Sequence, residues 1–141
     1  GKVTVHLEDA AHPWYTIHQP AAWDNLAPTP ELLQAARDAD AICFGTLAQR
    51  SPVSRDTIYR VLAAARTECL TVYDINLRQE YYARDWIERS LRDSRIAKIN
   101  NDEVAIVAPL LELPISLDGF AAAVVEKFGM DAVCVTRAAE C

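Results

Sequence analysis

Strand-like and helix-like segments alternate regularly from about residue 30 to the end of the chain. Four apolar runs are too short for helices, and each leads into a glycine or a polar residue. These runs lie at 41–44, 70–73, 96–99 and 132–135, and segments with helical periodicity lie at 30–39, 54–66, 83–93, 101–111 and 116–128. The alternation predicts an α/β fold, with an open, mostly parallel sheet and flanking helices.

The first residues have a different character. Residues 3–7 alternate apolar and polar side chains, and residues 14–18 form a second β-prone run after a turn-forming stretch. Two such runs separated by turn residues predict an antiparallel β-hairpin. We therefore expect a β segment at residues 1–26 and an α/β core at residues 27–141.

Composition argues against several classes of protein. The 141 residues carry a net charge of −6, which argues against binding to nucleic acid or to an anionic membrane. No apolar run approaches the roughly 18 residues that a membrane-spanning helix needs. The cysteines include no C-x-x-C pair, and Cys43 and Cys134 lie in apolar runs, so we expect buried, reduced thiols in a cytoplasmic protein.

Polar side chains follow all four predicted strands. Ligands of open parallel sheets bind beyond the carboxyl ends of the strands, so these residues form the candidate site. The candidates are Gly45 after the first strand, Asp74, Asn76 and Arg78 after the second, Lys98, Asn100 and Glu103 at the third, and Thr136 and Arg137 at the fourth. A purely structural α/β domain would place turn residues there, but seldom arginine, aspartate, lysine and glutamate together.

Two groups of these candidates have a definite chemistry. Asp74 and Asn76 can hold sugar hydroxyls or a hydrated cation, and Arg78 can bind a phosphate or a carboxylate through paired donors. Asn100 and Glu103 stand one helical turn apart, so they can anchor the waters around Mg²⁺. Each group also fits an ordinary strand-to-helix turn with capping side chains, and the residues alone leave that alternative open.

The candidates belong to four sequence strings, at 44–47, 74–78, 98–103 and 133–137. In order and spacing these strings resemble the PfkB (ribokinase-like) carbohydrate kinases, and most closely the fructokinase-like branch. The resemblance covers nearly all of this chain, whereas the chain corresponds only to the central part of the family fold. It implies a ribokinase-like fold and the ATP-dependent phosphorylation of a sugar hydroxyl.

The resemblance also implies which residues face the sugar. The N-terminal hairpin is similar to part of the β lid that closes over the sugar in this family, and Gly45 corresponds to a position on the sugar side. Asp74, Asn76 and Arg78 correspond to residues that line the cleft between the sugar and the phosphates.

On the nucleotide side, the resemblance implies that ATP and Mg²⁺ are the cofactors. Asn100 and Glu103 correspond to the pair that positions Mg²⁺ through water, and Thr136 opens a loop of the T-x-G-x-x-G type. The sequence departs from that loop, because Ala138 and Cys141 stand where glycines are expected. The residues placed on this side are Lys98, Asn100, Glu103, Thr136 and Arg137.

One part of the family pattern does not occur in this sequence. The G-A-G-D motif of these kinases supplies an anion-binding helix and a catalytic aspartate, and no G-x-G-D string is present here. The only methionine is Met130 and the chain opens directly on a strand, so we expect a piece of a longer polypeptide. We therefore expect the catalytic base to lie outside this chain, the isolated chain to be inactive, and a homodimer to form through the lid or an exposed sheet edge.

Two other classes of protein remain as alternatives. In a phosphoacceptor receiver domain, Asp74 would be the phosphorylated residue, Lys98 the strand-end lysine, and Glu8 and Asp9 the metal-binding acids. Against this, a hairpin strand follows the acidic pair, and the lysine comes one strand too early. The other alternative is a non-catalytic α/β interaction or sugar-binding module.

Overall fold

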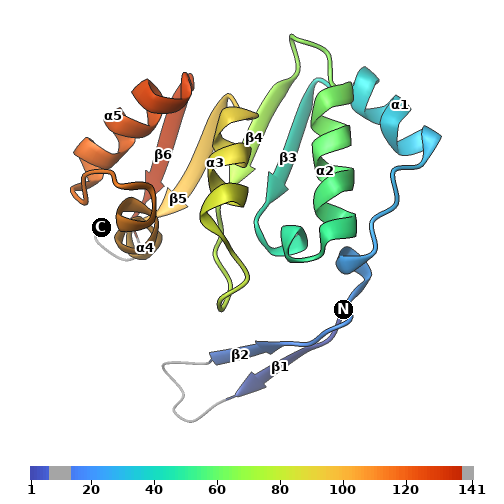
Figure 1. The fold of residues 1–141 in the computed structure, drawn as a ribbon, viewed down its shortest axis with the longest axis horizontal. Coiled ribbons are helices and arrows are strands. Elements are labelled where there is room, and N and C mark those ends of the chain that lie inside the picture. The colour runs from blue at the N-terminus through green and yellow to red at the C-terminus, as the bar shows by residue number, and fades with distance from the viewer. Residues whose placement is uncertain (7–13, 138–141) are drawn as a thin grey trace.

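The structure, a computed structural model of the chain, describes residues 1–6 and 14–137. A two-stranded hairpin precedes a four-stranded sheet that is joined by helices (Figure 1). The strands are β1 (Val3–His6), β2 (Trp14–Ile17), β3 (Ala41–Gly45), β4 (Leu70–Asp74), β5 (Ile96–Asn100) and β6 (Ala132–Thr136). The helices are α1 (Pro30–Asp38), α2 (Pro52–Ala64), α3 (Arg84–Arg92), α4 (Asn101–Leu111) and α5 (Leu117–Phe128), with short 3-10 turns η1 (Ala22–Asp24) and η2 (Leu47–Arg50).

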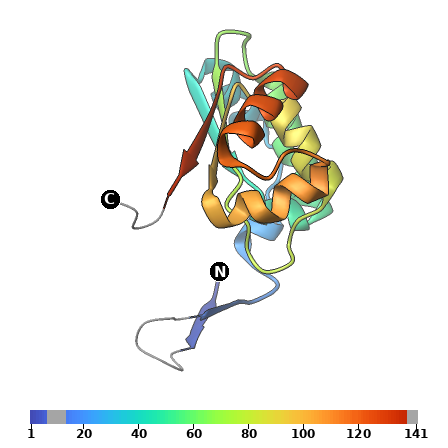
Figure 2. The same ribbon diagram turned by 90° about the vertical axis from the view of Figure 1, so that its left-hand side faces the viewer.

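The larger sheet is parallel throughout. β3, β4, β5 and β6 lie side by side in chain order, with Phe44 paired to Tyr73 and Tyr73 to Ala97. Successive right-handed crossovers that all step in the same direction leave their helices on one face of the sheet. Figure 2 shows α2, α3, α4 and α5 on that face. This arrangement confirms the predicted α/β fold with a parallel sheet and flanking helices.

The core lies between the sheet and these helices. Tyr73 and Ile99 point from the strands into it, and Ile87, Val107 and Phe120 close it from the helices. All five side chains are buried, with 1% or less of their surface exposed. Burial of such large apolar side chains is the main free-energy gain that holds the sheet and helices together.

Local signals set the ends of the helices. Thr29 Oγ1 accepts a hydrogen bond from Leu32 N at 3.2 Å and so caps α1. α2 begins at Pro52, slightly before the predicted start, because proline fits the first position of a helix. Gly129 ends α5 with a φ of +68°, which glycine adopts without strain. Within residues 1–6 and 14–137, no helix is both long and apolar enough to span a bilayer.

The other face of the sheet carries no helix among the described residues. Cys43, Val72, Ile96 and Ala132 lie in one row across this open face, because side chains alternate along each strand. Cys43 and Cys134 are both exposed, so the prediction that they are buried was wrong. Both point to the open face, where their apolar sequence surroundings do not protect them from solvent.

The N-terminal hairpin is confirmed. β1 and β2 pair antiparallel, with Val3 opposite Ile17, and Thr4 Oγ1 lies 2.7 Å from His18 Nε2. The residues that join the strands, 7–13, lie outside the described residues. Figure 1 shows the hairpin projecting from the core on the side where the strands of the large sheet end. The division at residue 26 stays a prediction.

The open face predicts that the isolated chain self-associates. Light scattering should give a mass above the 15.7 kDa of one chain, because uncovered apolar strands pair with other molecules. Val72→Lys, in the middle of this face, should shift the protein toward the monomer. Ile115→Lys serves as the control, since Ile115 is 65% exposed between α4 and α5 and should not change the mass. A monodisperse 15.7 kDa species before substitution would contradict the prediction.

Candidate functional site

Three of the predicted site residues meet at the carboxyl ends of the strands. Gly45, Asp74 and Lys98 pair in one row across β3, β4 and β5. Lys98 Nζ lies 3.2 Å from Asp74 Oδ1, and both side chains are about one-third exposed. A Cβ at Gly45 would stand only 3.1 Å from the carbonyl oxygen of Asp74, so glycine permits this close approach. The result is a charged pair with partly exposed side chains, beside a strand end that lacks a side chain.

The loop after β4 has an unusual backbone. Asn76 has a φ of +41°, in the left-handed region that residues with a Cβ seldom adopt. The preceding residue is held twice, because Ile75 N donates to Lys98 O at 3.0 Å and Thr46 Oγ1 donates to Ile75 O at 2.5 Å. Arg78, two residues after Asn76, is exposed, and its Nη1 donates to Leu77 O at 2.9 Å.

Glu103 is buried at the start of α4, with 5% of its surface exposed. Its Oε2 accepts a hydrogen bond from Asn100 N at 3.0 Å, while Asn100 Oδ1 accepts one from Glu103 N at 2.8 Å. This reciprocal pair is a capping box, which satisfies two free N–H groups at the helix start. Its other oxygen, Oε1, accepts a hydrogen bond from Leu77 N at 2.7 Å.

This geometry does not fit a magnesium ion held by the protein. Both oxygens of Glu103 already accept main-chain hydrogen bonds, and the buried side chain offers a metal-bound water almost no surface. The amide oxygen of Asn100 is also engaged. Among the described residues, no three histidine, cysteine, aspartate or glutamate side chains gather in one place.

The remaining predicted residues lie along β5 and β6. Asn100 pairs with Thr136, and Thr136 Oγ1 donates a long hydrogen bond of 3.4 Å to Ile99 O. Thr136 and Arg137 are exposed. Asn100 and Thr136 share the open face with Lys98, so the structure brings these three together. Glu103 is hydrogen-bonded to Asn100, but its own side chain is buried.

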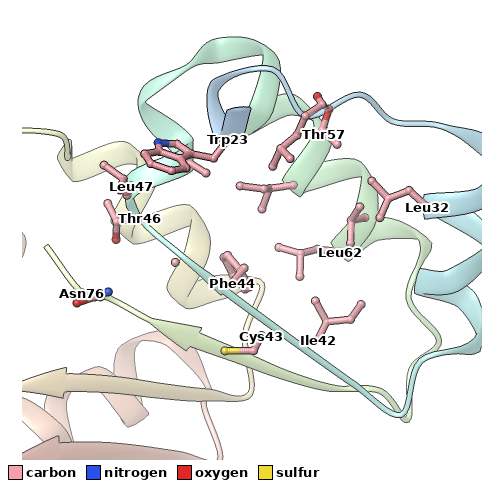
Figure 3. Close-up of a pocket in the computed structure, with 15 residues that line it drawn as sticks. Trp23, Leu32, Ile42, Cys43, Phe44, Thr46, Leu47, Thr57, Leu62 and Asn76 are labelled. Carbon is pink, nitrogen blue, oxygen red and sulfur yellow. Dashed lines mark hydrogen bonds between the residues drawn. The ribbon is translucent and has the colours of Figure 1, made fainter. Parts of the chain in front are cut away.

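A cavity of about 470 Å³ lies beside β3, the edge strand of the sheet (Figure 3). Its lining is mainly apolar, from β3 and the adjoining helices, and Asn76 contributes one of its few polar groups. The labelled aliphatic and aromatic side chains around it are Trp23, Leu32, Ile42, Phe44, Leu47 and Leu62. A sugar needs several hydrogen-bond partners, so the row of Gly45, Asp74 and Lys98 suits a sugar better than this cavity does.

Sequence reasoning missed a buried ion pair that joins the hairpin to the core. Arg50 donates from Nε and Nη2 to the two carboxylate oxygens of Asp24, each at 2.8 Å, and from Nη2 to His18 O at 3.2 Å. Its guanidinium also stacks 4.5 Å from the ring of Tyr81. The side chains of Arg50 and Asp24 are only 5% and 12% exposed. The hydrogen bonds from Arg50 hold the pKa of Asp24 below its ordinary value.

A second missed feature is a buried polar network beneath the strand ends. Thr46 Oγ1 lies 2.6 Å from the hydroxyl of Tyr73, and Gln49 Nε2 donates to Ser90 Oγ at 2.9 Å and to Gly45 O at 3.1 Å. Burial raises the pKa of the Tyr73 hydroxyl, which therefore stays protonated. Satisfied buried networks of this kind fix the backbone around them, here at the ends of β3 and β4.

No family model and no curated protein matches the sequence. Solved structures do match. Fructokinase from Xylella fastidiosa has a TM-score of 0.77 and 15% identity over 97% of this chain and 45% of that chain. The PfkB protein from Polaromonas sp. JS666 has a TM-score of 0.70 and 18% identity over 93% and 46%.

A third match is aminoimidazole riboside kinase from Salmonella enterica, complexed with aminoimidazole riboside and an ATP analogue. It has a TM-score of 0.68 and 18% identity over 91% of this chain and 42% of that chain. The chain thus spans less than half the length of each of these three proteins. Identities at this level establish the architecture, and the chain has the ribokinase-like fold of these kinases.

Proposed function

We propose that this chain forms part of a sugar kinase that transfers a phosphoryl group from ATP to a sugar hydroxyl, with a ketohexose as the preferred class of substrate. The observation that carries the proposal is the cluster of Gly45, Asp74 and Lys98 at the strand ends of a ribokinase-like fold. Strand ends of open parallel sheets are where ligands of such folds bind.

The sugar side of this site is assigned to β3 and the loop after β4. Gly45 permits the close approach of the Asp74 main chain, and the carboxylate of Asp74 can accept hydrogen bonds from sugar hydroxyls. Asn76 offers both a donor and an acceptor, and Arg78 is exposed and able to turn toward a phosphate. The hairpin, on the same side of the sheet, is suited to cover a bound sugar (Figure 1).

The nucleotide side is assigned to the ends of β5 and β6. Lys98 and Arg137 supply positive charge for phosphate oxygens, and Asn100 and Thr136 supply hydrogen-bond donors on the same face. Phosphoryl transfer depends chiefly on positioning and on stabilising negative charge, so donors of this kind suit the reaction. We assign the base that accepts the proton of the sugar hydroxyl to a residue outside these 141 residues.

The receiver-domain alternative has one observation in its favour, the 3.2 Å contact between Lys98 and Asp74. The topology weighs against it. Among the described residues, β1, which ends at His6 shortly before Glu8 and Asp9, pairs with β2 alone, in a separate sheet. A receiver needs such acids beside the phosphoacceptor, and this pair lies outside the described residues.

The experiment assays the polypeptide encoded by the whole reading frame that contains this chain. We expect ADP formation from ATP that depends on an added sugar, tested over ketohexoses, aldohexoses, pentoses and ribosides. Asp74→Asn should lower turnover about tenfold or more, because it removes a charged group from the proposed site at the carboxyl ends of the strands. Asp131→Asn is the matched control, since Asp131 pairs with Arg95 at the opposite ends of the strands. Labelling of Asp74 by acetyl phosphate, without transfer to any sugar, would instead support the receiver class.

A further inference from the structure

The loop after β4 contains a conformation that must be held in place. Asn76 adopts a φ of +41°, where its Cβ crowds the backbone. A non-glycine residue keeps such a conformation only where the surrounding structure over-determines it, and such residues cluster at functional sites. The groups that hold Asn76 are therefore informative about the site.

Two buried side chains form hydrogen bonds with the peptide groups on either side of Asn76. Before it, Thr46 Oγ1 donates to the carbonyl of Ile75, and Thr46 is 1% exposed. After it, the N–H of Leu77 donates to Glu103 Oε1 at 2.7 Å, and Glu103 is 5% exposed. Both contacts come from distant parts of the chain, so they tie the loop to β3 on one side and to α4 on the other.

The contact with Leu77 is more than the capping box requires. The box at the start of α4 uses Oε2 of Glu103 and the side chain of Asn100. Oε1 is left over, and it reaches the main chain of a different loop. A hydrogen bond from a buried N–H to a carboxylate is stronger than one between neutral groups, so this contact can hold a strained turn.

We propose that Glu103 is a positioning residue, which locks Asn76 in its left-handed conformation and so sets where the loop that carries Arg78 leaves β4. The inference rests on the proposed function, because this loop supplies the assigned contacts with sugar and phosphate. Glu103 thus acts on the ligand side through the backbone of Leu77, and it needs no metal ion to do so.

Hydrogen exchange at single-residue resolution, in dilute solution with EDTA, tests the proposal. The readouts are the amides of Leu77, which bonds to Glu103, and of Ile75, which bonds to Lys98 O at 3.0 Å. We expect Glu103→Gln to speed exchange at both amides by about tenfold or more. Asp102→Asn is the matched control, because it removes the same charge from an exposed residue in the same helical turn.

Rescue at Asn76 separates positioning from general stabilisation. Glycine adopts a positive φ without strain, so Asn76→Gly in the Glu103→Gln background should restore the protection of Ile75. Amides of helix α1, which lies at the opposite end of the sheet from α4 (Figure 1), should change little throughout. A loss of protection spread evenly over the chain, no rescue by Asn76→Gly, or an effect of Glu103→Gln that appears only with Mg²⁺ would each overturn the proposal.

The unsubstituted chain gives a second test, which does not depend on the folding of any variant. The amide of Leu77 lies in a loop and has a side-chain acceptor, so it should exchange about as slowly as the amides of β4. Exchange at the rate of an exposed loop would refute the proposal. None of these measurements requires ATP or a sugar, so absence of kinase activity with intact loop coupling would count against the proposed function alone.

Discussion

The isolated 141-residue chain is expected to transfer phosphate from ATP to fructose at least about 10⁴-fold more slowly than an ordinary sugar kinase. The sequence contains no G-x-G-D string, and the chain spans 45% of the length of the fructokinase that it matches. A general base and preformed donors for developing charge each account for a large factor in rate. Coupled measurement of ADP release checks this directly.

The control for this measurement is the polypeptide from the whole reading frame, assayed under the same conditions. It should show sugar-dependent turnover where the chain alone shows none. Turnover by the isolated chain at an ordinary rate would mean that residues 1–141 contain a complete active site. The assignment of the catalytic base to residues outside 1–141 would then be wrong.

Arg50→Ala is expected to lower the free energy of unfolding by about 3 kcal/mol, because it leaves the buried Asp24 carboxylate without its partner. Urea unfolding followed by circular dichroism measures the change. Arg60→Ala is the control, since the pair of Arg60 with Asp56 is 59% exposed on both sides and should contribute less than about 1 kcal/mol. Equal effects of the two substitutions would show that the pair of Arg50 and Asp24 is not specially stabilising.

Acid should remove the same contribution from the unsubstituted chain. The pKa of Asp24 is lowered in the folded state, so its ion pair stabilises the fold above the ordinary carboxyl pKa. This stabilisation is lost as the pH falls through the lowered value, where the folded state also takes up the proton. The difference in stability between the unsubstituted chain and Arg50→Ala should therefore shrink in strong acid, and a constant difference would contradict this assignment.

The sequence was sufficient to predict the fold class and to place the candidate residues at the ends of the strands. Short apolar runs separated by helical periods predict parallel strands, and parallel strands bring their carboxyl ends to one edge of the sheet. The order of the strands comes from the structure. The sequence therefore placed Asp74 and Lys98 at the same edge of the sheet, and in the structure they also form a contact of 3.2 Å.

Contacts between residues that are far apart in the sequence could not be predicted from it. Arg50 and Asp24 are 26 positions apart, as are Glu103 and Leu77, and no local periodicity links either pair. The exposure of Cys43 was missed for another reason. An apolar run predicts burial on both sides of a strand, whereas burial here depends on what covers the second face.

The one-sided sheet gives each strand two different tolerances to substitution. Along β5, Ala97 and Ile99 face the helices with no exposed surface, whereas Ile96 and Lys98 face the open side. In a scan that places every amino acid at each position of the isolated chain, substitutions in β3 to β6 should destabilise the fold at every second position. The positions between, on the open face, should tolerate most substitutions. In the polypeptide from the whole reading frame, the same scan would show which parts of the open face are covered. Open-face positions that no longer tolerate substitution are the ones against which another part of the protein packs.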